Sequence, residues 1–290
     1  MMTFKKSALA FVAMTTVAIT TVACGSKKSS TTPPGGTVVT KGDDSPSSLA
    51  CNGTNSDPAT HNSNLSIKVH TVVQPLTGST FPALPGAHVA VYNVATGTTS
   101  GMAVTTSSNA LGLLTLKDST RYAFKVTHAP NGSTSYKDTY QFNSLTPTVS
   151  SAASFVFNLR MIDSTLYSAF IGLIGLQATD VMGTTQVAAA VTDCDGDMLK
   201  HVQVDTINRC QGHTTFPCVA YFSNGAPSPN ATETDASGQF IVAGVPAGAP
   251  FTVHLKGVIT SGTAAVELGK LTIYGEADSV ALGTTEPLAP

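Results

Sequence analysis

The chain has 290 residues, enough for about two domains of ~100–150 residues each. Only 11% of the residues are charged, against ~25% in an average soluble protein, and the formal net charge is −2. The sequence contains no basic stripe, so we expect no nucleic-acid partner. It contains no Trp, and aromatic residues make up 7%, which counts against a flat aromatic platform for sugars. Ser, Thr, Ala, Val and Gly favour β-sheet and turns over long helices.

Residues 1–24 are typical of a signal peptide for export. Lys5 and Lys6 supply the positive region, and Ala8 to Ala23 supply an apolar stretch that is too short for a membrane span. The stretch ends T-V-A-C-G, which is similar to a bacterial lipobox, where small residues precede a Cys that receives lipid. The resemblance implies that Cys24 is the lipidated residue of a lipoprotein.

Two features of this segment bear on that interpretation. Thr21 departs from the usual Leu, Val or Ile of a lipobox, and the alternative is a Cys beside an ordinary cleavage site. Gly25 does not match the Asp retention signal known in some bacteria, which favours the outer membrane. We therefore expect a lipid-anchored protein of the bacterial cell envelope, because acyl chains give stable anchoring when more than one is present.

Residues 25–63 are expected to form a disordered tether. Ser, Thr, Pro and Gly dominate the segment, and no apolar period appears in it. Such a composition cannot bury enough apolar surface to fold. We expect the tether to act as a spacer that holds the following domains away from a membrane.

Residues 64–160 are expected to form the first β-sandwich. Leu65, Ile67 and Val69 alternate with polar residues, and further runs repeat that period of two. The further runs contain Val89 and Val91, Leu114 and Leu116, Tyr122, Phe124 and Val126, and then Tyr140, Phe142, Phe155 and Phe157. Short strands separated by turns rich in Gly, Pro and Asn are typical of a sandwich.

One helix is expected over residues 163–176, within a linker of residues 161–183. Apolar residues recur every four positions from Ile162 to Ile174, and Asp163 can cap the start. We expect this helix to pack between the two domains. Its apolar run is too short to span a membrane.

Residues 184–283 are expected to form the second sandwich, and residues 284–290 a loose tail. The stretch 234–255 reads T-D-A-S-G-Q-F-I-V-A-G-V-P-A-G-A-P-F-T-V-H-L, in which turn residues separate two alternating strands. By this alternation, Phe240 points into the core and Gln239 points toward solvent.

The pattern T-x-A-x-G-x-F followed by G-x-P-x-G-x-x-F-x-V resembles the closing half of a carboxypeptidase regulatory-like domain, a small prealbumin-like β-sandwich. For the opening half of the family pattern, the chain offers Val191, Asp193, Asp195, Gly196, Leu199, Val202 and Val204. Met198 stands where the family usually has Pro. The resemblance covers residues 184–256 and implies only a fold, because the motif carries no catalytic residue.

The first domain is similar to a diverged copy of the second. P-G-A-H-V-A-V at 85–91 parallels L-K-H-V-Q-V at 199–204, and S-N-A-L-G-L-L parallels T-D-A-S-G-Q-F, which makes Leu114 the counterpart of Phe240. The expected fold is therefore all-β: two tandem prealbumin-like or Ig-like sandwiches with one short linker helix. We expect separate cores that melt separately.

The cysteines other than Cys24 are even in number, which indicates disulfides in an exported chain. Cys210 and Cys218 flank a short insertion, so we favour that bridge, with Cys194 joined to Cys51. In the alternative pairing, Cys194 joins one of the two insertion cysteines and Cys51 is free. Zinc is a weaker hypothesis, because no C-x-x-C spacing exists.

The segment D-C-D-G-D is the one weak candidate for a metal site. Asp193, Asp195 and Asp197 alternate as in a calcium loop, but the segment is short and lacks a distal Glu, so a polar turn between strands is favoured. The seven histidines show neither H-x-H nor H-E-x-x-H spacing. Alternation places His88 and His201 toward solvent.

The sequence favours a non-enzymatic, membrane-anchored envelope lipoprotein whose sandwiches serve as a binding or spacer module. The alternative is a carbohydrate-binding surface module. A hydrolase or an accessory to a peptidase is weaker, because no G-x-S-x-G, S-x-x-K or P-loop motif appears. Expected partners are the membrane, through the N-terminal lipid, and a glycan, a cell-wall component or an envelope protein. No cofactor is expected.

Overall fold

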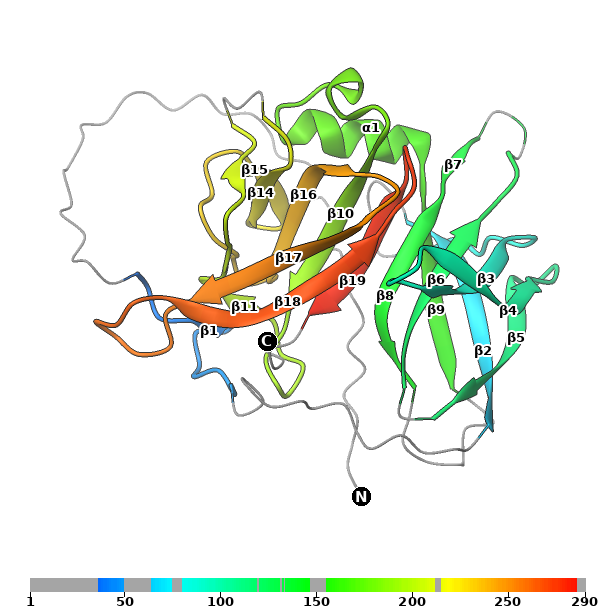
Figure 1. Cartoon of the computed structure of the whole chain (residues 1–290), viewed down its shortest axis with the longest axis horizontal. Coiled ribbons are helices and arrows are strands. Elements are labelled where there is room, and N and C mark those ends of the chain that lie inside the picture. Colours follow the sequence, from blue (N-terminus) through cyan, green and yellow to red (C-terminus); the bar gives the residue numbers. More distant parts are fainter. Residues whose placement is uncertain are drawn as a thin grey trace.

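The computed structural model describes residues 36–49, 64–74, 80–118, 120–130, 132, 134–146, 155–211 and 215–285. The predicted signal peptide and the last five residues lie outside this part. The predicted all-β class is confirmed: strands dominate the described residues, and α1 is their one α-helix (Figure 1).

Ten strands form one sheet within the described residues. In order across the sheet they are β13 (Asn208–Arg209), β14 (Cys218–Ser223), β16 (Gln239–Pro246), β10 (Thr184–Val191), β19 (Val280–Thr285), β8 (Thr139–Leu145), β6 (Arg121–Thr127), β3 (His88–Asn93) and β4 (Thr98–Thr105). The tenth, β15 (Ala226–Ser228), pairs with β14. This order takes the sheet through both predicted domains.

Three smaller sheets accompany the large one. The first contains β5 (Leu111–Lys117), β2 (Asn64–Val73), β9 (Val156–Asp163) and β7 (Tyr136–Lys137). The second contains β12 (Gln203–Val204), β17 (Pro250–Gly257) and β18 (Val266–Tyr274). The third pairs β1 (Thr40–Lys41) with β11 (Leu199–Lys200).

We call the half that contains β2–β9 the first sandwich and the half that contains β10–β19 the second sandwich. They are joined by a parallel pairing of β19 with β8, in which Val280 lies opposite Thr139 and Gly283 opposite Phe142. A parallel pairing between distant segments requires a long connection. Here the last strand of the chain returns to the middle of the sheet, between β10 and β8.

Apolar side chains gather in three clusters. One fills the first sandwich, with Phe124 and Leu159 fully buried. The second lies inside the second sandwich around Phe240, but it also takes in Tyr140 and Phe142 of β8. The two cores therefore lie on opposite faces of β3 and β6, since Val91 and Phe124 belong to the first core and Tyr92 and Ala123 to the second, and the second core extends into the first sandwich. This contact was not expected from the sequence, which predicts two separate cores.

The third cluster lies under helix α1 (Ser164–Leu173) and packs its side chains on the second sandwich. The helix is shorter than the predicted 163–176, because β9 runs to Asp163, whose side chain then caps the helix by accepting from Leu166 N at 2.7 Å. Its apolar face covers Ala188 and Ile241 of the large sheet, and its Tyr167 ring lies 4.6 Å from Nζ of Lys137 in β7, so the helix contacts both sandwiches. No described helix is long and apolar enough to cross a bilayer.

Strand β16 shows the consequence of this helix. Phe240 is fully buried, as predicted, but Gln239 is only 3% exposed, so the expectation that it faces solvent is wrong. Phe240 packs in the second sandwich, while Ile241 and Ala243 pack under α1. Both faces of this strand are covered, so the period of two no longer separates buried from exposed residues.

Candidate functional site

The N-terminal segment 36–49, which we call the strap, lies against the second sandwich. It was predicted to belong to a disordered tether of residues 25–63, and this boundary needs correction. Thr40 and Lys41 pair antiparallel with β11, and Val39 is 2% exposed within the second core. The backbone N–H of Val39 donates to Val258 O at 2.8 Å. Composition did not predict the strap, because one buried side chain, Val39, and the partly buried Leu49 supply its apolar contact with the core.

Two glycines allow the strap to approach this closely. A Cβ added at Gly42 would lie 2.5 Å from the backbone oxygen of Ala236, and one added at Gly257 would lie 2.3 Å from Val39 Cγ2. No side chain fits at either distance. Gly42 N also donates to Met198 O at 2.9 Å, which fixes the end of the paired segment.

Residues 193–197, which we call the acidic loop, are organised around one buried carboxylate. Asp193 is fully buried, and its side chain accepts from three backbone N–H groups. The donors are Ser48 of the strap at 2.9 Å, Asp195 at 3.0 Å and Asp197 at 2.9 Å. A buried carboxylate with several N–H donors is well satisfied. Asp193 therefore shapes its own loop and also holds the strap.

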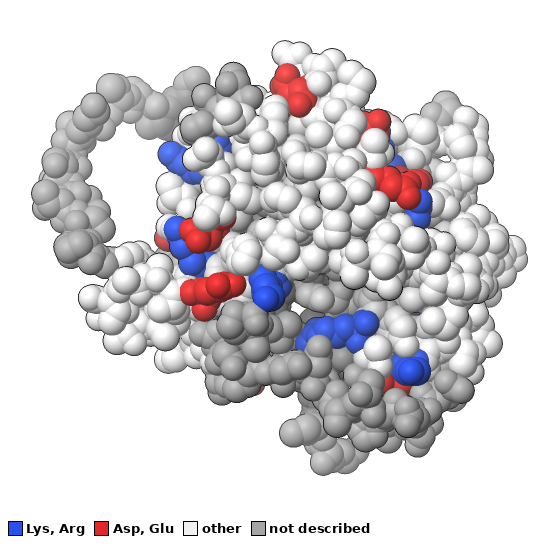
Figure 2. All heavy atoms as spheres, in the orientation of Figure 1, with Lys and Arg blue, Asp and Glu red and all other residues white. Residues whose placement is uncertain are grey.

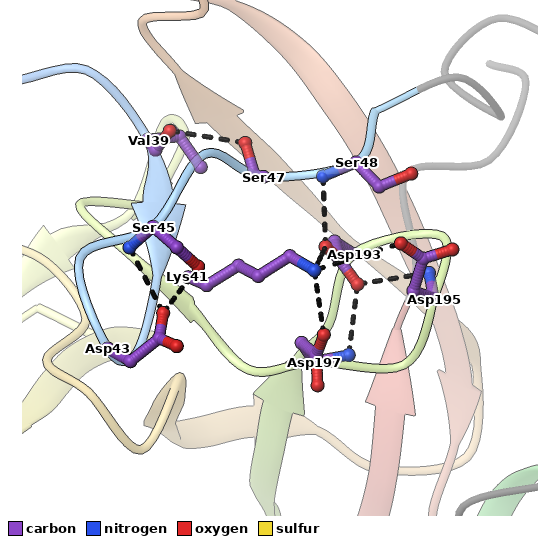
Figure 3. Close-up of polar contacts among 9 residues, drawn as sticks. All are labelled: Val39, Lys41, Asp43, Ser45, Ser47, Ser48, Asp193, Asp195 and Asp197. Atoms are coloured by element: carbon purple, nitrogen blue, oxygen red, sulfur yellow. Dashed lines mark hydrogen bonds and ion pairs between the residues drawn. The ribbon is translucent and has the colours of Figure 1, made fainter.

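Lys41 of the strap reaches into the acidic loop (Figure 3). Its Nζ lies 2.8 Å from Asp197 Oδ2, 3.6 Å from Asp193 Oδ2 and 3.7 Å from Asp195 Oδ2. The hydrogen bond to Asp197 is the main cause that raises the pKa of Lys41. The three carboxylates of the weak calcium candidate thus surround an ammonium group. Within the described residues, no group of three or more His, Cys, Asp or Glu side chains is arranged to hold a metal.

The cysteine predictions have different outcomes. The bridge between Cys210 and Cys218 is confirmed, with the two Cα atoms 4.7 Å apart. Cys194 is disulfide-bonded, and its N–H donates to Ser48 O at 2.9 Å. The predicted partner, Cys51, and the predicted lipidation residue, Cys24, lie outside the described residues, so both assignments stay predictions.

A groove of about 300 Å³ lies beside the strap. Thr37 forms part of one wall, and His201, Glu233 and Lys256 supply its charged or titratable side chains. His201 Nδ1 lies 2.7 Å from Glu233 Oε1, which orients the imidazole. His201 also adopts a left-handed backbone with φ of 64°, which is uncommon for a residue other than Gly. No sequence motif predicts this groove, because the residues of its walls are distant from one another in the chain.

Two further histidines, His254 and His88, lie outside the lining of the groove. His254 Nδ1 lies 3.0 Å from Glu267 Oε1 on the exposed face of the β17–β18 hairpin, away from the groove lining. His88 is exposed, as predicted. His201 is only partly exposed and lies in the groove, so the expectation that it simply faces solvent is incomplete.

A seam of tyrosines joins the two sandwiches, and sequence reasoning missed it. The ring of Tyr92 lies 4.9 Å from that of Tyr140 and 5.8 Å from that of Tyr274, between centroids. Burial raises the pKa of both Tyr92 and Tyr140. Lys125 of the first sandwich donates to Glu276 of the second at 2.8 Å beside these rings. The seam therefore combines apolar packing with an ion pair between the sandwiches.

Comparisons with known proteins add little to this geometry. No family model and no curated protein matches the chain. The shaft pilin SpaA of Lactobacillus rhamnosus GG is 11% identical, with 78% of this chain and 98% of that chain covered and a TM-score of 0.25. The minor pilin GBS52 of Streptococcus agalactiae is 14% identical, with 77% and 94% covered and a TM-score of 0.20.

A third solved structure, the full-length pilus protein RrgB of Streptococcus pneumoniae, is 12% identical, with 77% of this chain and 47% of that chain covered and a TM-score of 0.22. TM-scores this low carry no argument about function. The sandwich description therefore rests on the strands and cores above, and the carboxypeptidase regulatory-like assignment stays a prediction.

Proposed function

We propose that the chain is a non-enzymatic envelope lipoprotein, anchored through Cys24, whose joined sandwiches form a binding or spacer module held close to the membrane. The observation that carries this proposal is the docked strap. If Cys24 bears lipid, the lipid is attached only twelve positions before Gly36, where the strap begins. Twelve extended residues span at most ~40 Å, since each adds ~3.3–3.6 Å.

The shared sheet supports the spacer part of this proposal. The pairing of β8 with β19, the tyrosine seam and the Lys125–Glu276 ion pair connect the sandwiches at several points. A joint of this kind resists bending better than a flexible linker does. The second sandwich carries the strap, so it is the half that the anchor holds near the membrane.

Cell fractionation tests the anchor. We expect Cys24→Ser to move the protein from the membrane fraction to the soluble fraction, because the lipid supplies the hydrophobic attachment. Cys51→Ser is the matched control and should leave the protein with the membranes. If the Cys24→Ser protein still sediments with membranes and resists both salt and carbonate washes, the lipoprotein assignment is wrong.

The groove beside the strap favours one second candidate, carbohydrate binding. Its size matches the lower end of ligand sites, ~300–1,000 Å³. Acceptors on Glu233 and donors on Lys256 suit hydroxyl groups, which both donate and accept. The groove lining contains no aromatic ring on which a sugar could stack, so this candidate ranks second.

A glycan array separates the two candidates. A carbohydrate-binding protein should retain specific glycans, and His201→Ala should remove that binding. His254→Ala is the matched control, because it removes the same kind of His–Glu pair on an exposed face outside the groove. Binding of no glycan, or equal loss in both variants, would eliminate the groove as a sugar site.

A further inference from the structure

The two sandwiches carry opposite net charge. Residues 64–160 contain six Lys or Arg and two Asp or Glu, a net charge of +4 with His neutral. Residues 184–283 contain four Lys or Arg and nine Asp or Glu, a net charge of −5. The small overall charge of −2 hides this separation. Charged residues are sparse on the visible surface and gather in small groups (Figure 2).

Part of the positive charge of the first sandwich lies on the outward face of the sheet that contains β2, β5 and β9. The outward-facing residues of β2, β5 and β9 include Lys68, Lys117 and Arg160, which we call the basic face. Lys68 lies opposite Leu113 on one neighbouring strand and Val156 on the other. Leu113 is 58% exposed and Val156 is 39% exposed. The ammonium group of Lys68 can pair with a carboxylate of a partner, and the two exposed apolar side chains beside it can pack against the same partner.

Two charges of the basic face, those of Lys68 and Lys117, are accessible to a partner. Lys68 and Lys117 are exposed and form no ion pair within the described residues. Burial lowers the pKa of Arg160 to about 10, which keeps it protonated at neutral pH. Of the two Asp residues between 64 and 160, Asp118 is buried and Asp138 lies near Lys125 at the seam.

The opposite charge is concentrated at the strap. Its acidic residues and those of the acidic loop are Asp43, Asp44, Asp193, Asp195 and Asp197, and the cations among them are Lys41 and Lys200. Five carboxylates and two ammonium groups leave a net charge of −3, opposite in sign to the basic face. The side chain of Asp44 is 72% exposed and that of Asp195 is 60% exposed, so the excess charge is accessible. We call this surface the acidic end.

The two surfaces lie far apart on the molecule. Along the long horizontal axis of Figure 1, β1 and β11 of the acidic end lie on the left, and β2 and β5 of the basic face lie on the right. A pair of complementary surfaces at different places on one chain makes a heterologous contact, which repeats from copy to copy instead of closing into a symmetric dimer.

We propose that the basic face of one copy binds the acidic end of a second copy, which gives head-to-tail self-association. Opposite charge supplies attraction and orientation, and the exposed Leu113 and Val156 add apolar area at the centre of the contact. The same chemistry already operates inside the chain, where Lys125 of the first sandwich pairs with Glu276 of the second. The proposal does not depend on the lipid anchor.

Sedimentation velocity of the full chain carrying Cys24→Ser tests this inference without an acyl chain. We expect the mean mass to rise with protein concentration at ~10 mM salt and to return to that of the monomer at ~1 M, where the screening length falls to ~3 Å. Lys68→Glu and Asp195→Lys should each be monomeric at low salt. Lys270→Glu makes the same charge change on an exposed Lys of the second sandwich. This control variant should associate as the parent chain does.

A mixture of the two monomeric variants gives the sharpest result. The Lys68→Glu chain keeps its acidic end and the Asp195→Lys chain keeps its basic face, so an equimolar mixture should associate although neither variant does so alone. Circular dichroism and thermal melting confirm that each variant is folded. A protein that is monomeric at all salt concentrations, or a mixture that stays monomeric, overturns the proposal. A monomer that instead sediments with phosphatidylglycerol vesicles through Lys68 also overturns it and assigns the basic face to a membrane.

Discussion

Strands β5 of the first sandwich and β16 of the second show how surroundings change the meaning of one pattern. In β5, Leu114 and Leu116 are buried, whereas Leu113 and Thr115, which alternate with them, are exposed. In β16, every residue from Gln239 to Val245 is buried. The outer face of β5 meets solvent, whereas α1 covers the outer face of β16. A period of two identifies the two faces of a strand. Whether the second face is exposed to solvent depends on whether another layer packs against it.

The largest expected loss of stability comes from removing a buried side chain from the core of either sandwich. Phe240→Ala should lower the free energy of unfolding by ~3–5 kcal/mol and Leu114→Ala by ~2–5 kcal/mol, because each leaves a cavity among buried side chains. Urea denaturation followed by circular dichroism measures both changes.

These two variants also test the shared sheet. The sequence predicts separate transitions for two domains, whereas the β8–β19 pairing and the core that includes Tyr140 lead us to expect one transition shared by both halves. Two resolved transitions, with Phe240→Ala shifting one and Leu114→Ala the other, would show that the joint does not couple the halves.

The next effect concerns the disulfide, which only the second sandwich contains among the described residues. Replacing both Cys210 and Cys218 with Ala should lower the free energy of unfolding by ~2–3 kcal/mol, as the chain-entropy model gives for a loop of this length. The midpoint of urea unfolding, compared with that of the parent chain, measures the loss. An unchanged midpoint would show that the bridge does not constrain the unfolded chain.

A smaller effect compares the two strands directly. Gln239→Ala should cost ~1–3 kcal/mol, because a buried side-chain amide is lost from a covered face. Leu113→Ala on the open face of β5 should stay within ~0.5 kcal/mol of the parent. Equal small losses in the same unfolding assay would show that burial of the Gln239 side chain does not stabilise the fold.

The smallest effect concerns the strap, and it depends on pH. The pKa of Lys41 is raised above its ordinary value of 10.5, so its ion pair contributes full stability below that pH and loses it as the pH rises through the folded pKa. We expect the unfolding midpoints of the parent and Lys41→Met to differ by a constant amount from pH 7 to about 10 and to converge at higher pH.

Lys200→Met removes the exposed pair with Asp44 and serves as the control, with a smaller difference. A gap between the parent and Lys41→Met that persists unchanged above the raised pKa would show that the charge of Lys41 is not what holds the strap.

Local pattern was sufficient for several features. The buried positions of Phe240 and Leu114, the bridge between Cys210 and Cys218, and the helix start at Asp163 follow from residues close in the chain. Alternation, loop closure and capping act over at most about ten residues, so one sequence displays them. The same reasoning could not predict the His201 groove, because its lining comes from five separate stretches of the chain.

The sequence by itself determined the all-β class, most strand positions and one disulfide, because those depend on neighbours along the chain. The tertiary structure decided which sheet each strand joins, and with it the burial of Gln239, the tyrosine seam and the docking of the strap. Lys41 reaches the acidic loop across 156 positions of sequence separation from Asp197, at a distance of 2.8 Å. No local period records such a contact, because its free energy arises only after the chain has folded.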